Sequence, residues 1–223
     1  MKARDARGRL PARMLLLLGL LPSPVLALQP CGDLRNAYGP FDYRTANPER
    51  KELVEGAHFT GDVETLTRGI SGKLGAEIDY TLRAFPNHPR ALLAIMKLGE
   101  REKTEKPGGS RYTVGCWFDR AIRFAPNDGA VRLLYGVYLS RKGEKQDAIK
   151  QLETARELIG EDANLHYNLG LAYFDLNQYD KSLEHAHAAY KLGFPLPGLR
   201  TKLQKAGKWR EPPRAPAAAE SRQ

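Results

Sequence analysis

The chain has 223 residues, a formal net charge of +9, two cysteines and 42% hydrophobic residues. This composition is typical of a globular protein and excludes collagen-like, cysteine-rich and wholly disordered chains. Residues 1–27 carry a net charge of +4 and residues 205–223 a net charge of +3, so only +2 remains between them. Because the excess lies at the two ends, the sequence argues against nucleic-acid binding, which requires a basic stripe on the folded body.

The first 27 residues have the pattern of a secretory signal peptide. A basic stretch precedes a short apolar run over 14–21, two prolines follow, and aliphatic and small residues lead to Ala27. A membrane-spanning helix needs about 20 apolar residues, which this segment does not supply. We therefore expect cleavage after Ala27 and a periplasmic or secreted chain with no membrane span. A lipoprotein modified on Cys31 is a weaker alternative, because Pro30 stands where a small residue is expected.

The two cysteines are the next feature, because an exported chain with an even number of them most simply forms disulfides. Pairing of Cys31 with Cys116 would close a loop of 85 residues. It would attach the N-terminal segment 28–57, which we expect to be irregular, to the body of the protein. Two unpaired thiols are the alternative.

A 34-residue period organises the second half of the chain. Shifting residues 132–158 by 34 places Gly136 on Gly170 and Ala155 on Ala189, and large residues fall on large ones. The last copy contains Tyr167, Asn168, Leu169, Gly170, Tyr173, Tyr179, Ser182, Ala186 and Ala189. These residues resemble the tetratricopeptide repeat (TPR), in which each copy is a pair of antiparallel helices.

The resemblance implies an all-α fold, a TPR-like helical-hairpin solenoid with an irregular N-terminal segment. Pro86-Asn87 and Pro126-Asn127 mark equivalent helix ends 40 residues apart, and the six additional residues fit the Gly- and Pro-containing stretch 103–110. We predict repeat units over 58–86, 89–126, 129–160 and 163–194, a capping helix over 197–209 and a disordered tail over 210–223. The chain also resembles a group of exported bacterial repeat proteins with no assigned activity, through Cys31-Gly32 and the segment 37–44.

Motifs for catalysis or metal binding are incomplete. The segment 69–74 resembles a phosphate-binding loop, but Thr67 and Leu74 occupy the positions where that loop needs Gly and Ser or Thr. His58 with Glu55 and Glu64 is a sparse metal-ligand set, and no His-Glu-x-x-His motif occurs. We therefore predict no catalytic residues, no metal site and no cofactor.

Binding is the function that such a repeat architecture predicts, because stacked helix pairs form a concave groove lined by the first helix of each pair. The predicted groove residues are Asn164, Tyr167, Asn168, Leu171, Phe174 and Asp175 in the last unit, and Leu133, Val137, Ser140 and Arg141 in the unit before it. The alternative for Tyr167 and Phe174 is packing against neighbouring helices. Leu133 and Val137 replace the lysine and asparagine of chaperone-binding TPR domains, which argues against a carboxylate clamp of that kind.

These expectations combine into a non-catalytic periplasmic interaction module or scaffold. It would hold a peptide or a partner helix in the groove, in envelope assembly or secretion, with no nucleic-acid partner. The alternative is an enzyme or an accessory domain that binds cell-wall glycan or a metal. Tyr38, Phe41 and Tyr43 would either pack on the first helices or enter the groove.

Overall fold

The structure is a computed structural model that describes residues 31–70 and 72–212, and within these ranges it contains ten helices and no strand. The helices are α1 (Pro48–His58), α2 (Gly61–Glu64), α3 (Leu74–Ala84), α4 (Pro89–Glu102), α5 (Val114–Phe124), α6 (Gly129–Lys142), α7 (Lys145–Ile159), α8 (Ala163–Asp175), α9 (Tyr179–Lys191) and α10 (Gly198–Lys205). The predicted all-α class is confirmed. The predicted signal peptide lies outside the described residues.

Several helices begin at side chains that satisfy free backbone N–H groups. The Asp128 carboxylate accepts hydrogen bonds from the N–H groups of Ala130 and Val131 at the start of α6. The carboxylate of Asp162 and the hydroxyl of Thr113 do the same at α8 and α5. Such caps contribute about 1 kcal/mol each, so short-range sequence signals determine where these helices start.

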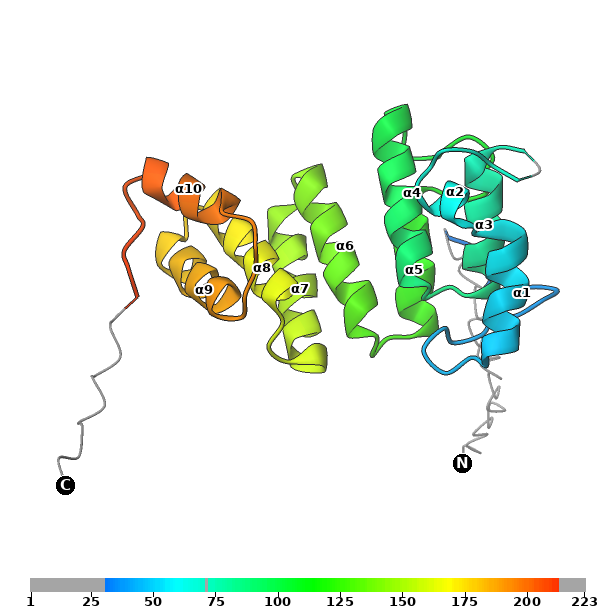
Figure 1. Ribbon diagram of the computed structural model, residues 1–223, viewed down its shortest axis with the longest axis horizontal. Coiled ribbons are helices and arrows are strands. Elements are labelled where there is room, and N and C mark those ends of the chain that lie inside the picture. The colour runs from blue at the N-terminus through cyan, green and yellow to red at the C-terminus, as the bar shows by residue number, and fades with distance from the viewer. Residues whose placement is uncertain (1–30, 71, 213–223) are drawn as a thin grey trace, which may run out of the picture.

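The helices form one row, with α1–α3 at one end and α8–α10 at the other (Figure 1). Helix α6 packs on α7 and α8 packs on α9, and in each case a short turn joins the two helices. Helix α4 contacts both α5 and α6, α7 contacts α8, and α10 lies against α8 and α9. Each pair therefore packs directly on the next.

Two glycines allow close contact between helices. A Cβ atom added at Gly136 in α6 would lie 2.5 Å from Leu152 Cγ of α7. A Cβ atom added at Gly170 in α8 would lie 2.4 Å from Leu199 Cδ2 of α10. Both distances are far shorter than van der Waals contact, so a larger residue at either position would require the neighbouring leucine side chain to move.

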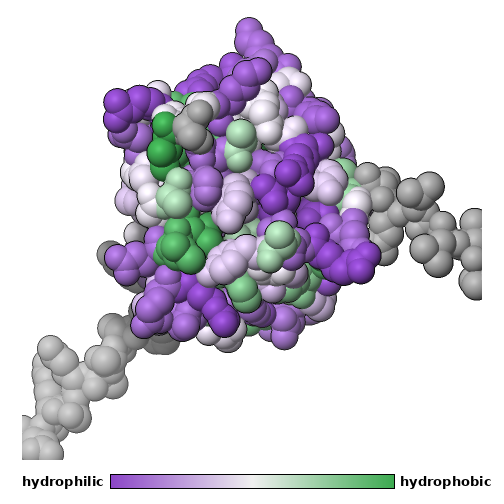
Figure 2. All heavy atoms as spheres, turned by 90° about the vertical axis from the view of Figure 1, so that its right-hand side faces the viewer, coloured by the Kyte–Doolittle hydropathy of each residue, from purple (hydrophilic) through white to green (hydrophobic). Residues whose placement is uncertain are grey.

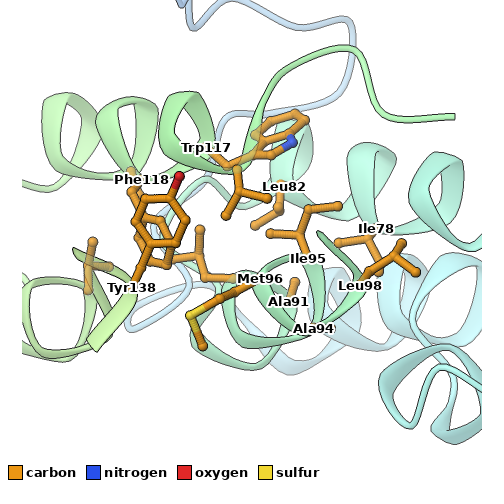
Figure 3. Close-up of a cluster of buried hydrophobic side chains, with 14 of the residues drawn as sticks. Ile78, Leu82, Ala91, Ala94, Ile95, Met96, Leu98, Trp117, Phe118 and Tyr138 are labelled. Atoms are coloured by element: carbon orange, nitrogen blue, oxygen red, sulfur yellow. The ribbon is translucent and has the colours of Figure 1, made fainter. Parts of the chain in front are cut away.

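The largest hydrophobic core lies between α3, α4, α5 and α6, where Ile78, Leu82, Ile95, Trp117 and Phe118 are fully buried (Figure 3). A second cluster joins α7 to α8, and a third joins α8 and α9 to α10 through buried Leu199 and Leu203. Helix α10 lies within the range predicted for a capping helix. It covers the apolar side of the last helix pair.

The N-terminal region differs from the prediction in that segment 28–57 is not irregular throughout. Residues Pro48–His58 form helix α1, which Asn47 caps by accepting a hydrogen bond from the N–H group of Arg50. Val54 is the buried residue of this helix. With one buried position, the sequence of α1 does not show the apolar stripe by which an amphipathic helix is recognised. The predicted first unit, 58–86, contains the single-turn helix α2 as well as α3, and α1 packs on α3.

The segment before α1 is attached to the body at both of its ends. Cys31 and Cys116 form a disulfide, as predicted. At the other end, Tyr38, Phe41 and Tyr43 surround Phe85 at the end of α3. The three aromatic residues therefore pack on the first helices.

The beginning of the predicted disordered tail 210–223 also has defined contacts. Arg210 donates to Asp180 Oδ1 at 2.7 Å, and Glu211 accepts from Arg200 at 2.8 Å. These ion pairs place Arg210 and Glu211 beside α9 and α10. Residues 213–223 lie outside the described chain.

Candidate functional site

The apolar residues predicted to line the groove in α8 face the C-terminal end of the row. The Tyr167 ring stacks on Phe194 with ring centroids 4.0 Å apart. Leu171 and Phe174 pack against the cluster that α9 and α10 form, and Lys202 of α10 lies over the Phe174 ring. Their apolar surface is therefore used largely in attaching the last elements to the row.

The polar residues predicted for the same groove bond within the chain. The side-chain amide of Asn168 donates to the carbonyl of Asn164, one turn earlier in α8, at 2.8 Å. Asp175 forms an ion pair with Lys202 at 3.5 Å, and its carbonyl accepts from Lys145 at 2.8 Å. The Asn168 amide nitrogen and the Asp175 carboxylate are therefore already engaged within the chain.

The predicted residues of α6 divide into two sets. Leu133 packs against the α7–α8 cluster, Val137 packs against the largest core, and Ser140 is half-buried. Arg141 is exposed and donates to both carboxylate oxygens of Glu100 in α4, at 2.7 and 2.8 Å. Arg141 also lines a cavity, and none of the other residues that line this cavity was predicted as a site residue.

This cavity lies between the C-terminal halves of α4 and α6, has a volume of about 630 Å³, and is called the α4–α6 cavity below. Its apolar part consists of Met96, Val114 and Tyr138. Its polar rim consists of Gly99, Glu100, Lys103, Thr104, Glu105, Arg141 and Lys142. Apolar floors with a few convergent polar groups are characteristic of ligand-binding sites.

The connection between α4 and α5 forms one wall of the α4–α6 cavity. Helix α4 ends at Glu102, the following residue Lys103 has a left-handed backbone with φ of 53°, and the chain continues into Pro107 and two glycines before α5. This connection contains the stretch 103–110, which accounts for the six residues by which the spacing of 40 exceeds the 34-residue period. The additional length brings Thr104 and Glu105 to the cavity, and it was the sequence signal by which this site could have been found.

Tyr138 and Lys142 both stabilise the ionised carboxylate of Glu105. The Tyr138 hydroxyl donates to Glu105 Oε2 at 2.6 Å, and Lys142 forms an ion pair with the other carboxylate oxygen. The Lys142 and Tyr138 hydrogen bonds lower the pKa of Glu105. Burial and the neighbouring Glu105 raise the pKa of Tyr138. At neutral pH the carboxylate is therefore ionised and the phenol is protonated, which is the state that this hydrogen bond requires.

Lys103 provides the remaining charge at the rim. Glu100 neutralises Arg141 and Glu105 neutralises Lys142, whereas Lys103 forms no ion pair with any described residue. The described residues that line the α4–α6 cavity include no cysteine, serine or histidine. The arrangement is suited to holding an apolar side chain above Tyr138 with an anionic group beside Lys103.

The sparse metal-ligand set considered in the sequence is not brought together. His58 Nδ1 lies 2.7 Å from Glu77 Oε2, while Glu55 and Glu64 both accept hydrogen bonds from Arg90. Across residues 31–70 and 72–212 there is no group of three or more histidine, cysteine, aspartate or glutamate side chains placed to hold a metal ion. In the same ranges, no helix is both long enough and apolar enough to cross a membrane.

Comparison with protein-family models finds no match to this chain, and comparison with curated proteins finds no significant match.

Proposed function

We propose that this chain is an exported, non-catalytic scaffold of the TPR type that holds a peptide segment of a partner protein, in envelope assembly or secretion. The 34-residue period, the helix pairs α6–α7 and α8–α9, and the close contacts at Gly136 and Gly170 support the repeat assignment. The disulfide is compatible with an oxidising compartment outside the cytoplasm.

The observation that carries the binding proposal is the α4–α6 cavity. Helices α4 and α6 are the first helices of their units, and these helices line the concave face of a repeat stack. The volume of about 630 Å³ accommodates one or two side chains and is too small for a whole helix. The site therefore favours an extended peptide with an apolar anchor next to Tyr138.

The charge of the cavity rim indicates which residue should lie next to the apolar anchor of the peptide. Lys103 is the cation with no carboxylate partner in the described chain, and Glu100 and Glu105 already bind Arg141 and Lys142. A peptide carboxylate adjacent to the apolar anchor would satisfy Lys103 without breaking either ion pair. We therefore expect a preference for an aromatic or aliphatic residue followed or preceded by Asp or Glu.

Selection from a random-peptide display library tests this proposal. Peptides enriched on the wild-type chain are synthesised, and their affinities are measured by fluorescence anisotropy. We expect Lys103→Glu to weaken binding at least tenfold, because it places a repelling charge at the rim. Thr104→Trp should weaken binding similarly, because it fills the cavity.

Lys97→Glu is the matched control, because Lys97 is an exposed residue of α4 that does not line the cavity. It makes the same change in net charge and should leave the affinity unchanged. Equal affinities for wild type, Lys103→Glu and Thr104→Trp would refute the assignment of this cavity as the binding site.

A further inference from the structure

The positive charge of the described chain is concentrated in its last 22 residues. Residues 191–212 contain six lysines and arginines and one glutamate, whereas residues 31–190 carry a net charge of −1. This segment includes the loop between α9 and α10, helix α10 and the chain after it. One end of the row is therefore basic, and the rest is close to neutral.

Exposed apolar side chains lie in the same segment. Leu192 and Leu196 are 44% and 58% exposed, on either side of Phe194 and Pro195 in the α9–α10 loop. Single exposed apolar residues are common on protein surfaces, but two leucines close together beside basic residues offer apolar contact area to a partner.

The loop is held close to the basic residues by specific contacts. The Tyr190 hydroxyl donates to the carbonyl of Leu196 at 3.2 Å and accepts from the N–H group of Arg200 at 3.0 Å. Lys191, Arg200 and the half-buried Trp209 line one hollow of about 600 Å³ together with prolines of the loop. Aromatic, proline and cationic groups thus line one hollow beside the loop, while Lys208 lies at the other end of α9, over the Tyr179 ring at 5.4 Å.

Half of the cations in this segment are not neutralised by the fold. Arg200, Lys202 and Arg210 form ion pairs with carboxylates. Lys191, Lys205 and Lys208 are exposed and form no ion pair with the described residues. Their positive charge is therefore available to a partner, and complementarity requires that partner to be anionic.

We propose that this end of the protein docks on an anionic lipid surface. Leu192 and Leu196 would enter the interfacial region, while Lys191, Lys205 and Lys208 approach lipid phosphates, as in other interfacial segments that combine basic and apolar residues. A lipid surface fits better than an acidic peptide, because the leucines project from an exposed loop and do not line a groove. Docking would hold the row of helices at the membrane surface with the α4–α6 cavity free.

Vesicle co-sedimentation tests the proposal with the chain that begins at residue 28, which retains every described residue and lacks the basic, apolar segment 1–27. The probes are vesicles of phosphatidylcholine alone and of phosphatidylcholine with phosphatidylglycerol. We expect binding to the anionic vesicles that weakens as salt is raised. Lys191→Gln/Lys205→Gln/Lys208→Gln should weaken it by about fivefold per lysine. Leu192→Ser/Leu196→Ser should weaken it at least tenfold.

The opposite end of the row supplies a matched control. Leu53 and Ile70 are 61% and 50% exposed. Figure 2 faces this end of the row, whose surface is mainly hydrophilic with a few small hydrophobic groups. Leu53→Ser/Ile70→Ser removes comparable exposed apolar surface and should leave vesicle binding unchanged. Trp209 fluorescence should shift to shorter wavelength on binding, while Trp117 is fully buried and should contribute no change.

Absence of binding to anionic vesicles would overturn the proposal, as would equal binding of all the variants. Binding to soluble polyglutamate with none to anionic vesicles would point to an acidic protein partner and would also reject a lipid surface. Lys103→Glu should bind vesicles as the wild type does, so failure of this proposal is distinguishable from failure of the peptide-binding proposal.

Discussion

Asn87 joins three parts of the protein, and its removal provides a sensitive test of the fold. Its side-chain amide donates to Asp42 and to Asp128, each at 2.8 Å, and its side-chain carbonyl accepts from the N–H group of Tyr43 at 2.9 Å. Only 1% of Asn87 is exposed. Replacement by alanine would leave the three partners without these bonds in a place that water does not easily reach.

The magnitude follows from the charge of the partners. Hydrogen bonds to charged groups contribute about 1.5–3 kcal/mol each and neutral ones about 1 kcal/mol. Asp42 and Asp128 would keep their contacts with Arg44, at 2.7 and 3.5 Å, which reduces the loss. We therefore expect Asn87→Ala to lower the free energy of unfolding by about 3 kcal/mol.

Asn127 is the matched control, because it follows a proline at the equivalent position 40 residues later. It is exposed, and its side chain accepts one long hydrogen bond, at 3.4 Å, from Arg44. Asn127→Ala should change the free energy of unfolding by less than about 0.5 kcal/mol. Urea unfolding of both variants at pH 7, followed by circular dichroism, makes the comparison. Equal destabilisation by the two substitutions would contradict the reasoning, as would a loss below 1 kcal/mol for Asn87→Ala.

Three further predictions concern the disulfide, a buried histidine and a helix contact. Cys31→Ser/Cys116→Ser should lower the free energy of unfolding by about 4 kcal/mol, because the 85-residue loop is no longer closed in the unfolded chain; an unchanged urea midpoint would contradict this. Burial lowers the pKa of His88 to about 4. As the pH falls from 6.5 to 4, His88 is therefore protonated in the unfolded state before it is protonated in the folded state. The free energy of unfolding should decrease across that window by at most about 3 kcal/mol. Urea midpoints measured at pH 7 and 4.5 should show a smaller difference for His88→Gln than for the wild type. Gly170→Ala would place a methyl group 2.4 Å from Leu199 Cδ2, and we expect a loss of about 1–3 kcal/mol with faster hydrogen exchange in α10; unchanged exchange would mean that α10 does not depend on this contact.

The sequence by itself determined the features that depend on short-range signals or on a repeated spacing. Side chains such as Asp128 and Asp162 are followed directly by the N–H groups that they cap, so helix starts can be read locally. The 34-residue period located the helix pairs α6–α7 and α8–α9, in which Gly136 approaches the carbonyl of Ala148 and Gly170 approaches the carbonyl of Ser182, the equivalent residue 34 positions later. The disulfide followed from cysteine count and expected compartment. Helix α1 was not predicted, because its one buried residue, Val54, produces no periodic pattern in the sequence.

Only the tertiary structure decided which polar and aromatic residues are available to a partner. Asn87 and Asn127 occupy the same motif, yet one is buried because segment 31–46 crosses it and the other is exposed. Tyr167 was predicted to line a groove, but the loop before α10 supplies Phe194, whose ring stacks on it. The α4–α6 cavity combines residues from two helices and from the loop that follows α4. Burial depends on elements that are distant in the chain, and for that reason local sequence patterns predicted the helices better than the candidate site.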